Sequence, residues 1–148
     1  MKFKALMVAA AFAVSMSATA AFAQATGPEA KAMLEKAVAA LKANKADALA
    51  KFVKKDGGFQ DRDLYVFCFN TSDGKFTAHV NEKLMGTDIR ALNVGGQPLG
   101  KQIFDGVKEG AVNTVDYNFP KPGTTNPVPK QSFITKVADQ GCGVGYYK

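Results

Sequence analysis

The order of the periodic segments restricts the fold of this 148-residue chain most, because one long helical stretch precedes every strand-like stretch. The spacing Thr26–Glu29 fits a capping box, with Pro28 in the first turn, where its missing N–H costs nothing. Apolar residues then recur at steps of three and four over about seven turns, at Leu34, Ala37, Val38, Leu41, Ala48, Leu49, Phe52 and Val53. We expect a helix that ends at Gly57-Gly58, with a break at Asn44 or Asp47.

Five strand-like segments follow, and a short helical segment separates the second from the third. The strand-like segments are rich in β-branched and aromatic residues, and they are Asp63–Asn70, Lys75–Asn81, Ala111–Phe119, Gln131–Val137 and Gly143–Tyr147. Asp73-Gly74 accepts the positive φ of a hairpin turn between the first two. The spacing of apolar residues over Leu99–Val107 predicts the short helix, with Gly110 as its stop. Glu82–Pro98 is irregular, and a proline-rich loop fills Pro120–Lys130.

Strands in succession, with the helices set apart, predict an α+β fold with an antiparallel sheet in a single domain. The long N-terminal helix would cover one face of a five-stranded sheet. The central loop would cover the other face. We therefore expect a small-ligand pocket beneath that loop.

The first 23 residues have the pattern of a secretory signal peptide. Lys2 and Lys4 precede the apolar run Ala5–Ala21, and Ala21-Phe22-Ala23 is a small-residue cleavage site. The alternative is an uncleaved membrane anchor, but the run is short for a membrane span. We expect a signal peptide over residues 1–23 and one domain over residues 24–148, periplasmic or secreted after cleavage near Ala23 and Gln24.

Charge and motif content exclude several classes of function. The formal charge of +6 is spread along the chain without a basic stripe of interleaved aromatic side chains, so nucleic acid is not an expected partner. Lys51, Lys54 and Lys55 indicate the solvated end of a helix instead. The single histidine, without clustered acidic residues, is a poor basis for a metal site. No C-x-x-C-H run is present, which excludes a c-type haem.

Catalysis is not expected either. A nucleophilic serine of the G-x-S-x-G type is absent, and no glycine-rich phosphate loop is followed by lysine and serine or threonine. Asp61 and Asp63 alternate at a strand start, where solvation is the ordinary role of a carboxylate. We assign no catalytic residue and no cofactor.

A series of short motifs links the predicted elements to a known family. In chain order they are Leu64-Tyr65-Val66-Phe67, Asp73-Gly74, Ala78-His79-Val80-Asn81, Leu84-Met85-Gly86-Thr87-Asp88, Tyr117-Asn118-Phe119-Pro120, Lys130-Gln131-Ser132-Phe133 and Gly143-Val144-Gly145-Tyr146-Tyr147. Their order and spacing resemble the single Cache domain family, which comprises extracytoplasmic sensor modules of chemoreceptors and histidine kinases. The resemblance covers about Glu29–Lys148 and implies a PAS-like fold, a long N-terminal helix on a five-stranded antiparallel sheet. A receptor would continue into a second membrane span and an output domain, so we expect a free-standing form.

The resemblance also implies candidate ligand-binding residues. In the Cache family the residues matching His79 and Tyr117 commonly lie beside the ligand, and a phenol can donate to a carboxylate oxygen. Strict alternation over Lys75–Asn81 would place His79 with Thr77 on one face, and Phe76 with Ala78 on the other. The alternatives are a solvated position for the histidine and a core position for the tyrosine.

Four further side chains are candidates for the same site. Lys130 opens a strand and can reach across to it, and Tyr65 starts the first strand. The Arg90 guanidinium would suit bidentate carboxylate binding. Met85 would provide an adaptable apolar wall. For Lys130 and Arg90 the alternative is an ordinary exposed position.

The two cysteines form the remaining pair. Export would place Cys68 and Cys142 in an oxidising compartment. In the Cache sheet the strands that carry them are neighbours, so the resemblance favours a structural disulfide. Two buried free thiols are the alternative.

Together these inferences predict a periplasmic sensor module that binds a small organic anion or an amino acid. An imidazole, a phenol, an ammonium group and loop N–H groups would converge on a carboxylate. A membrane-bound receptor or kinase is the expected partner, and the long helix would allow a homodimer. The alternative is a structural or accessory protein that binds another exported protein and no small ligand. An exposed apolar patch would favour that alternative.

Overall fold

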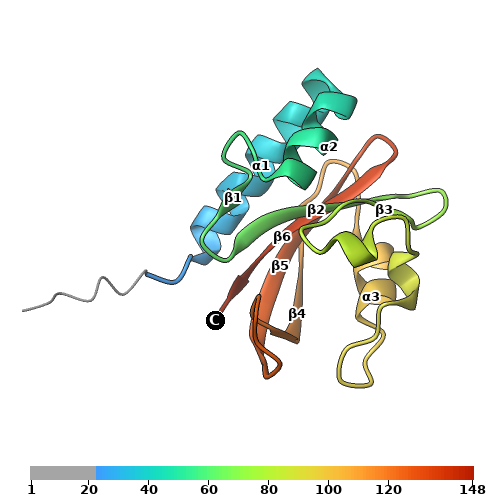
Figure 1. Cartoon of the computed structure of the whole chain (residues 1–148). Coiled ribbons are helices and arrows are strands. Elements are labelled where there is room, and N and C mark those ends of the chain that lie inside the picture. The colour runs from blue at the N-terminus through green and yellow to red at the C-terminus, as the bar shows by residue number, and fades with distance from the viewer. Residues whose placement is uncertain (1–22) are drawn as a thin grey trace, which may run out of the picture.

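The computed structural model describes residues 23–148, with two helices on one face of an antiparallel sheet and a third helix on the other (Figure 1). The helices are α1 (Gly27–Ala43), α2 (Lys45–Lys54) and α3 (Leu99–Gly106), and two 3₁₀ turns are η1 (Glu82–Leu84) and η2 (Ile89–Ala91). Apart from Ala23, the predicted signal peptide lies outside the described residues. No helix within residues 23–148 is long and apolar enough to cross a membrane.

The N-terminal helix forms with the predicted cap and the predicted break. The Glu29 carboxylate accepts hydrogen bonds from the backbone N–H and the hydroxyl of Thr26, both at 2.8 Å. Asn44 ends α1, and its side chain accepts a hydrogen bond from the Asp47 N–H at 3.1 Å, which starts α2. The helical stretch stops earlier than expected, because Lys55 takes the left-handed conformation at φ 61° before Gly57 is reached.

The sheet contains six strands, one more than predicted, because a two-residue strand pairs with its edge. The strands are β1 (Gln60–Asp61), β2 (Leu64–Asn70), β3 (Phe76–Ala78), β4 (Asn113–Pro120), β5 (Pro127–Val137) and β6 (Gln140–Tyr147). Their order is β1-β2-β6-β5-β4, with β3 also paired to β2, and every pairing is antiparallel. The prolines did not prevent β5 from starting at Pro127, because β6 pairs with β5 only from Lys130 onward, so Pro127 and Pro129 have β4 as their one paired strand.

Strict alternation fails in β3, and the face assignment of its side chains was wrong. The β2–β3 register shifts between Cys68 and Phe69, so the strand is irregular at that point. As a result Phe76 packs on one side of the sheet and Ala78 on the other. The strand also ends at Ala78, so His79 lies just beyond it and packs against the Phe76 ring.

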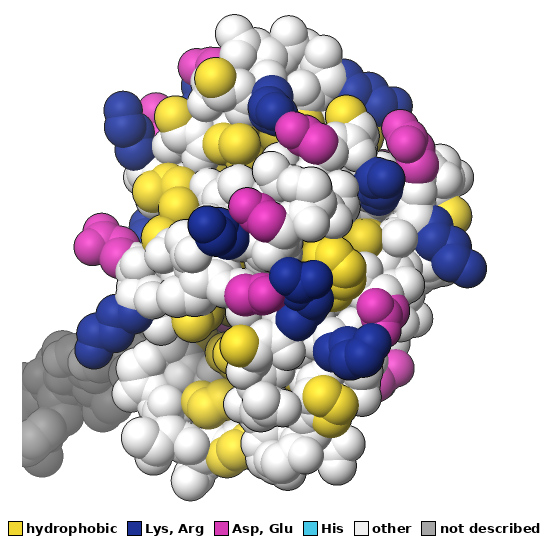
Figure 2. Space-filling view, turned by 90° about the vertical axis from the view of Figure 1, so that its right-hand side faces the viewer, with side chains coloured by type: hydrophobic (Ala, Val, Ile, Leu, Met, Phe, Trp, Pro, Cys, Tyr) yellow, Lys and Arg dark blue, Asp and Glu magenta, His cyan; other side chains and the backbone are white. Residues whose placement is uncertain are grey.

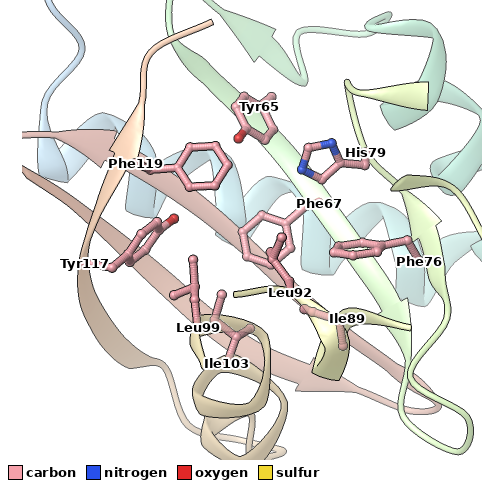
Figure 3. Close-up of a pocket in the computed structure, with 10 residues that line it drawn as sticks. All are labelled: Tyr65, Phe67, Phe76, His79, Ile89, Leu92, Leu99, Ile103, Tyr117 and Phe119. Atoms are coloured by element: carbon pink, nitrogen blue, oxygen red, sulfur yellow. The ribbon is translucent and has the colours of Figure 1, made fainter. Parts of the chain in front are cut away.

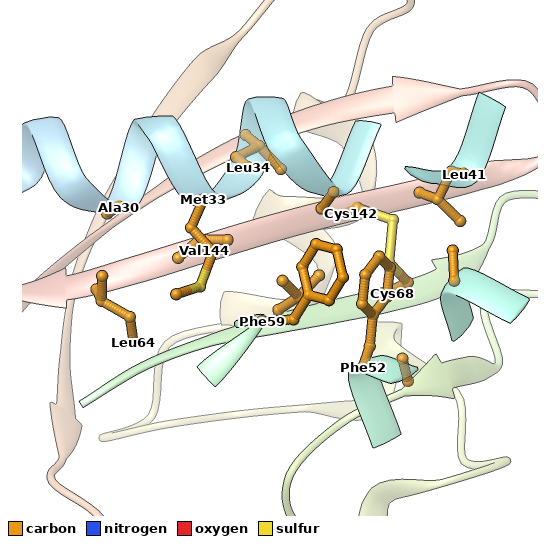
Figure 4. Packing of buried hydrophobic residues seen from close by; sticks show 14 of the residues in the cluster. Ala30, Met33, Leu34, Leu41, Phe52, Phe59, Leu64, Cys68, Cys142 and Val144 are labelled. Atoms are coloured by element: carbon orange, nitrogen blue, oxygen red, sulfur yellow. A yellow bond between two sulfur atoms is a disulfide. The ribbon is translucent and has the colours of Figure 1, made fainter. Parts of the chain in front are cut away.

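Two hydrophobic clusters flank the sheet. The first lies between the helices and the sheet, where Met33, Leu34 and Leu41 of α1 contact β2 and β6 (Figure 4). The predicted disulfide between Cys68 and Cys142 joins these two strands inside this cluster, with both cysteines fully buried. The second cluster lies between the opposite face and the segment that carries η1, η2 and α3. The central segment therefore covers the second face, as predicted.

Candidate ligand-binding site

A small cavity lies in the second cluster, beneath the central segment (Figure 3). Its polar lining residues are Tyr65, His79 and Tyr117. The rest of the lining is apolar and comprises Phe67, Phe76, Ile89, Leu92, Leu99, Ile103 and Phe119. The free volume is about 20 Å³, room for about one water molecule. The cavity therefore combines an apolar wall with a few hydrogen-bonding groups, as ligand sites commonly do.

A buried ammonium group lies next to this cavity. Lys130 is only 2% exposed, and its Nζ donates a hydrogen bond to the Tyr65 hydroxyl at 3.2 Å. The same Nζ lies 4.6 Å from the ring centroids of Tyr65 and Tyr147, and 5.3 Å from that of Phe119. Within residues 23–148 no carboxylate forms an ion pair with it. Three aromatic rings thus surround a cation that forms no ion pair in the described part of the chain.

The environment of Lys130 disfavours its charge. Burial lowers the pKa of Lys130 to about 8, and the more distant Asp63 carboxylate opposes that shift. Cation–π attraction offsets only part of the lost hydration, about 1–2 kcal/mol for a desolvated cation. An anion that reaches this group would restore the interactions that burial removed.

Strand register brings Lys130 to this place. Lys130 of β5 is the direct partner of both Tyr117 on β4 and Tyr147 on β6, so all three side chains project from one face. Gly145 makes room for the lysine, because a Cβ there would lie 2.6 Å from the Lys130 Cε. It would also lie 2.5 Å from the Ser132 Oγ. The lysine therefore crosses β6 where the strand has no side chain.

His79 faces the cavity as a neutral hydrogen-bond donor. Its Nδ1 accepts a hydrogen bond from the Asn81 N–H at 2.9 Å, so the proton of the neutral ring is on Nε2. Burial lowers the pKa of His79 to about 4, and the Lys130 charge adds to the effect. The imidazole also packs edge-on against the Tyr65 ring, with centroids 5.3 Å apart.

Tyr117 is the third polar group of the lining. Its hydroxyl shares a 2.7 Å hydrogen bond with the Ser132 hydroxyl. Burial raises the pKa of both Tyr117 and Tyr65 well above the usual tyrosine range. Both phenols therefore stay protonated and can donate a hydrogen bond to an anion.

The two remaining candidates lie elsewhere. Arg90 forms an ion pair with Asp88 at 2.7 Å and lies over the ring of Phe104. Met85 follows η1, and neither Met85 nor Arg90 lines the cavity. No group of three histidine, cysteine or acidic side chains within residues 23–148 is arranged to hold a metal ion.

Sequence reasoning missed Ser132, Gly145 and Tyr147 as parts of the site. All three lie in the quoted motifs, but they gain their roles only from partners on other strands. The sequence pattern that could have indicated them is the strand alternation along β5 and β6, in which side chains two residues apart share a face. It places Ser132 on the face of Lys130, and Gly145 on the face of Tyr147.

The comparisons with known proteins agree with this architecture. A sequence model of the Cache domain matches residues 29–145. The chain belongs to the Cache domain family. No curated protein matches the chain.

Solved Cache-like structures share the fold at low sequence identity. A methyl-accepting chemotaxis protein from Vibrio parahaemolyticus RIMD 2210633 is 22% identical, with a TM-score of 0.65 over 81% of this chain and 86% of its own. The periplasmic sensor domain of a chemotaxis protein is 25% identical, with a TM-score of 0.59 over 79% of this chain and 86% of its own. A Cache chemosensory domain studied for carboxylic acid recognition is 23% identical, with a TM-score of 0.59 over 79% of this chain and 84% of its own.

Proposed function

We propose that this Cache domain is a periplasmic sensor module that binds a small carboxylate, and that it is a binding protein rather than an enzyme. The observation that carries the proposal is the buried Lys130 ammonium without an anionic partner among residues 23–148. A buried charge without a partner destabilises the fold, and an anionic ligand that pairs with it would offset that cost. The carboxylic acid recognition named for a similar Cache structure supports the same ligand class.

The lining suggests how a carboxylate would be held. Tyr65 lies between Lys130 and the cavity, and its hydroxyl is already within 3.2 Å of the ammonium. We propose that the carboxylate binds near this hydroxyl, with Lys130 supplying the charge and the phenol of Tyr117 and Nε2 of His79 supplying further hydrogen bonds. The aliphatic side chains of η2 and α3 would contact the carbon chain of the ligand.

The small free volume implies that a ligand displaces part of the wall. About 20 Å³ cannot hold an organic acid. The central segment packs on the sheet through side chains such as Ile89, Leu92 and Leu99. A shift of this segment on binding would be the signal passed to a membrane-bound receptor or kinase.

The test is isothermal titration of the chain from Gln24, which contains every residue of both cores, with acetate, butyrate, succinate and a set of amino acids. We expect binding that Lys130→Met abolishes. The variant should also be more stable at pH 7 by about 2 kcal/mol, because it removes a buried charge while an unbranched side chain, one atom shorter than lysine, fills most of the same space. That gain in stability would show that the loss of binding is not caused by unfolding.

A pH series sharpens the test. Since the pKa of Lys130 is lowered to about 8, carboxylate affinity should fall by up to tenfold for each pH unit above that value. Lys31→Met, at an exposed position of α1, is the matched control and should leave binding unchanged. If the folded protein binds none of these compounds, or binds them equally well with Met at position 130, the proposal is overturned.

Within residues 23–148 the exposed side chains give little support to the accessory-protein alternative. Val112 is the only large hydrophobic side chain exposed within residues 23–148. On the face over the central segment, basic and acidic side chains are interspersed with small hydrophobic areas (Figure 2). We therefore keep ligand binding as the proposed function.

A further inference from the structure

A surface hollow adjoins the buried cavity beside the turn that follows β4. The two share Tyr65, His79 and Phe119 as lining residues, and the turn Pro120–Thr124 forms one side of the hollow. Its volume of about 430 Å³ lies in the range of small-molecule sites. The hollow is therefore a natural entrance to the ligand site.

The charged side chains of the hollow are mostly basic. Lys55, Arg62 and Lys121 line it, together with one acidic residue, Asp63. The Arg62 guanidinium is engaged by two carboxylates, at 2.6 and 2.8 Å. Lys55 and Lys121 form no ion pair within the described part of the chain. Two cations thus remain to attract an anion.

A second hollow reaches the cavity from the other side but has a different character. It shares Leu99 and Tyr117 with the cavity and has a volume of about 380 Å³. Its charged lining residue is Asp116, which forms an ion pair with Lys148. An anion would therefore approach the cavity from the side of Lys121.

One aromatic ring connects the cation at the entrance with the buried cation. The Lys121 Nζ lies 5.3 Å from the centroid of the Tyr147 ring, and the Lys130 Nζ lies 4.6 Å from the same centroid. The two ammonium groups are therefore no further apart than the sum of these distances. The Tyr147 hydroxyl donates to the Pro120 carbonyl at 2.8 Å, which fixes the turn carrying Lys121 against this ring.

We propose that Lys121 binds a second anionic group of the ligand, so that the site selects dicarboxylates over monocarboxylates of equal length. This inference rests on the proposed function, because Lys130 must hold the first carboxylate. Lys121 is half-buried and already donates to the Gln24 Oε1 at 3.0 Å, so its ammonium is held at the entrance. A dicarboxylate would bridge the buried and the half-buried cation.

Asp63 provides the competing possibility. Its carboxylate lines the same hollow and would attract the ammonium group of an amino acid. It already accepts a hydrogen bond from the Ala25 N–H at 3.3 Å, and Lys55 and Lys121 outnumber it. The balance of charge favours a dianion over a zwitterion.

Three probes of matched length distinguish these cases, namely succinate, butyrate and 4-aminobutyrate. They carry a carboxylate at one end and a carboxylate, a methyl or an ammonium group at the other. Titration of the chain from Gln24 should show succinate binding about twofold to fivefold tighter than butyrate, as expected for one partly exposed ion pair. Lys121→Gln should remove that preference and leave butyrate affinity unchanged.

The outcomes separate this inference from the proposed function. Equal affinity for succinate and butyrate, with both lost in Lys130→Met, would overturn the role of Lys121 and keep the carboxylate site. Tighter binding of 4-aminobutyrate, reversed by Asp63→Asn, would assign the entrance to an amino acid instead. Failure of all the acids to bind the folded protein would overturn the proposed function itself. Lys31→Gln on α1 is the control for a general change of charge.

Discussion

At the scale of single residues, the site is defined by polar groups whose ordinary hydration has been removed. His79 and Lys130 are both basic and both buried, and the Lys130 charge opposes protonation of His79. Only the lysine keeps its charge at neutral pH, because its pKa of about 8 is above 7 while that of the histidine is about 4. The site therefore offers an anion one full charge and several neutral donors.

The buried imidazole predicts a particular loss of stability in acid. The unfolded chain takes up a proton on His79 near pH 6.5, whereas the folded chain resists it until about pH 4. The contribution to stability is complete above pH 6.5 and is lost as the pH falls toward 4, by about 3 kcal/mol in total. Urea unfolding at pH 7 and pH 4 should therefore show a smaller difference for His79→Gln than for the wild type. An unchanged difference would mean that the histidine is solvated in the folded protein.

At the scale of elements, β5 and β6 build the site by register. The backbone of β6 approaches the side chains of β5 closely because Gly145 has no side chain. The same strand holds the disulfide on its opposite face, through Cys142. One strand therefore supports the helix-side core and the ligand-side cavity at once.

A matched pair of glycine substitutions separates positioning from stability. In Gly145→Ala the new methyl group would meet Ser132 and the stem of Lys130, so we expect a loss of about 1–3 kcal/mol in stability. We also expect at least about a tenfold loss of carboxylate affinity, because one displaced charged hydrogen bond is worth about that much. Gly141→Ala meets the Phe69 ring at 2.3 Å on the same face, away from the cavity lining. Gly141→Ala should lower stability by a similar amount and leave carboxylate affinity unchanged. Equal carboxylate affinity in the two variants would show that Gly145 does not position the site.

At the scale of the whole molecule, the sheet separates two cores of different composition. The helix-side core contains apolar residues and the disulfide, whereas the other core contains the cavity and the polar groups beside it. In the proposed function, the central segment would shift on binding while α1, α2 and the disulfide hold the sheet. Ligand-binding segments are commonly drawn from the less stable parts of a fold.

The disulfide should therefore affect stability without affecting binding. Cys68 and Cys142 are 74 residues apart, and a crosslink of that span stabilises by about 4 kcal/mol in the chain-entropy model. The double variant Cys68→Ala, Cys142→Ala should lose about this much free energy of unfolding in urea denaturation and keep the carboxylate affinity of the wild type at a temperature where it is folded. A large change in affinity would show that the two cores are coupled through the sheet.

The sequence alone determined the local elements of this protein. The capping box at Thr26, the break at Asn44 and the short helix from Leu99 depend on neighbouring residues, and each was predictable for that reason. The order of the motifs indicated the family, and the resemblance to the Cache sheet favoured the pairing of Cys68 with Cys142. The candidate site was predictable in part, since Tyr65, His79 and Tyr117 line one cavity and Lys130 adjoins it.

Only the tertiary structure decided how deeply each side chain is buried and against which partners. The shift in β2–β3 register moved Phe76 and Ala78 to opposite sides, which no two-residue alternation predicts. The burial of Lys130 depends on a gap at Gly145 and on rings from three other strands. These contacts join residues far apart in the chain, so their energies cannot be inferred from the spacing of neighbouring residues. Interactions between chain neighbours determined the helices and turns, whereas packing between strands distant in the chain determined the burial of Lys130 beside the cavity.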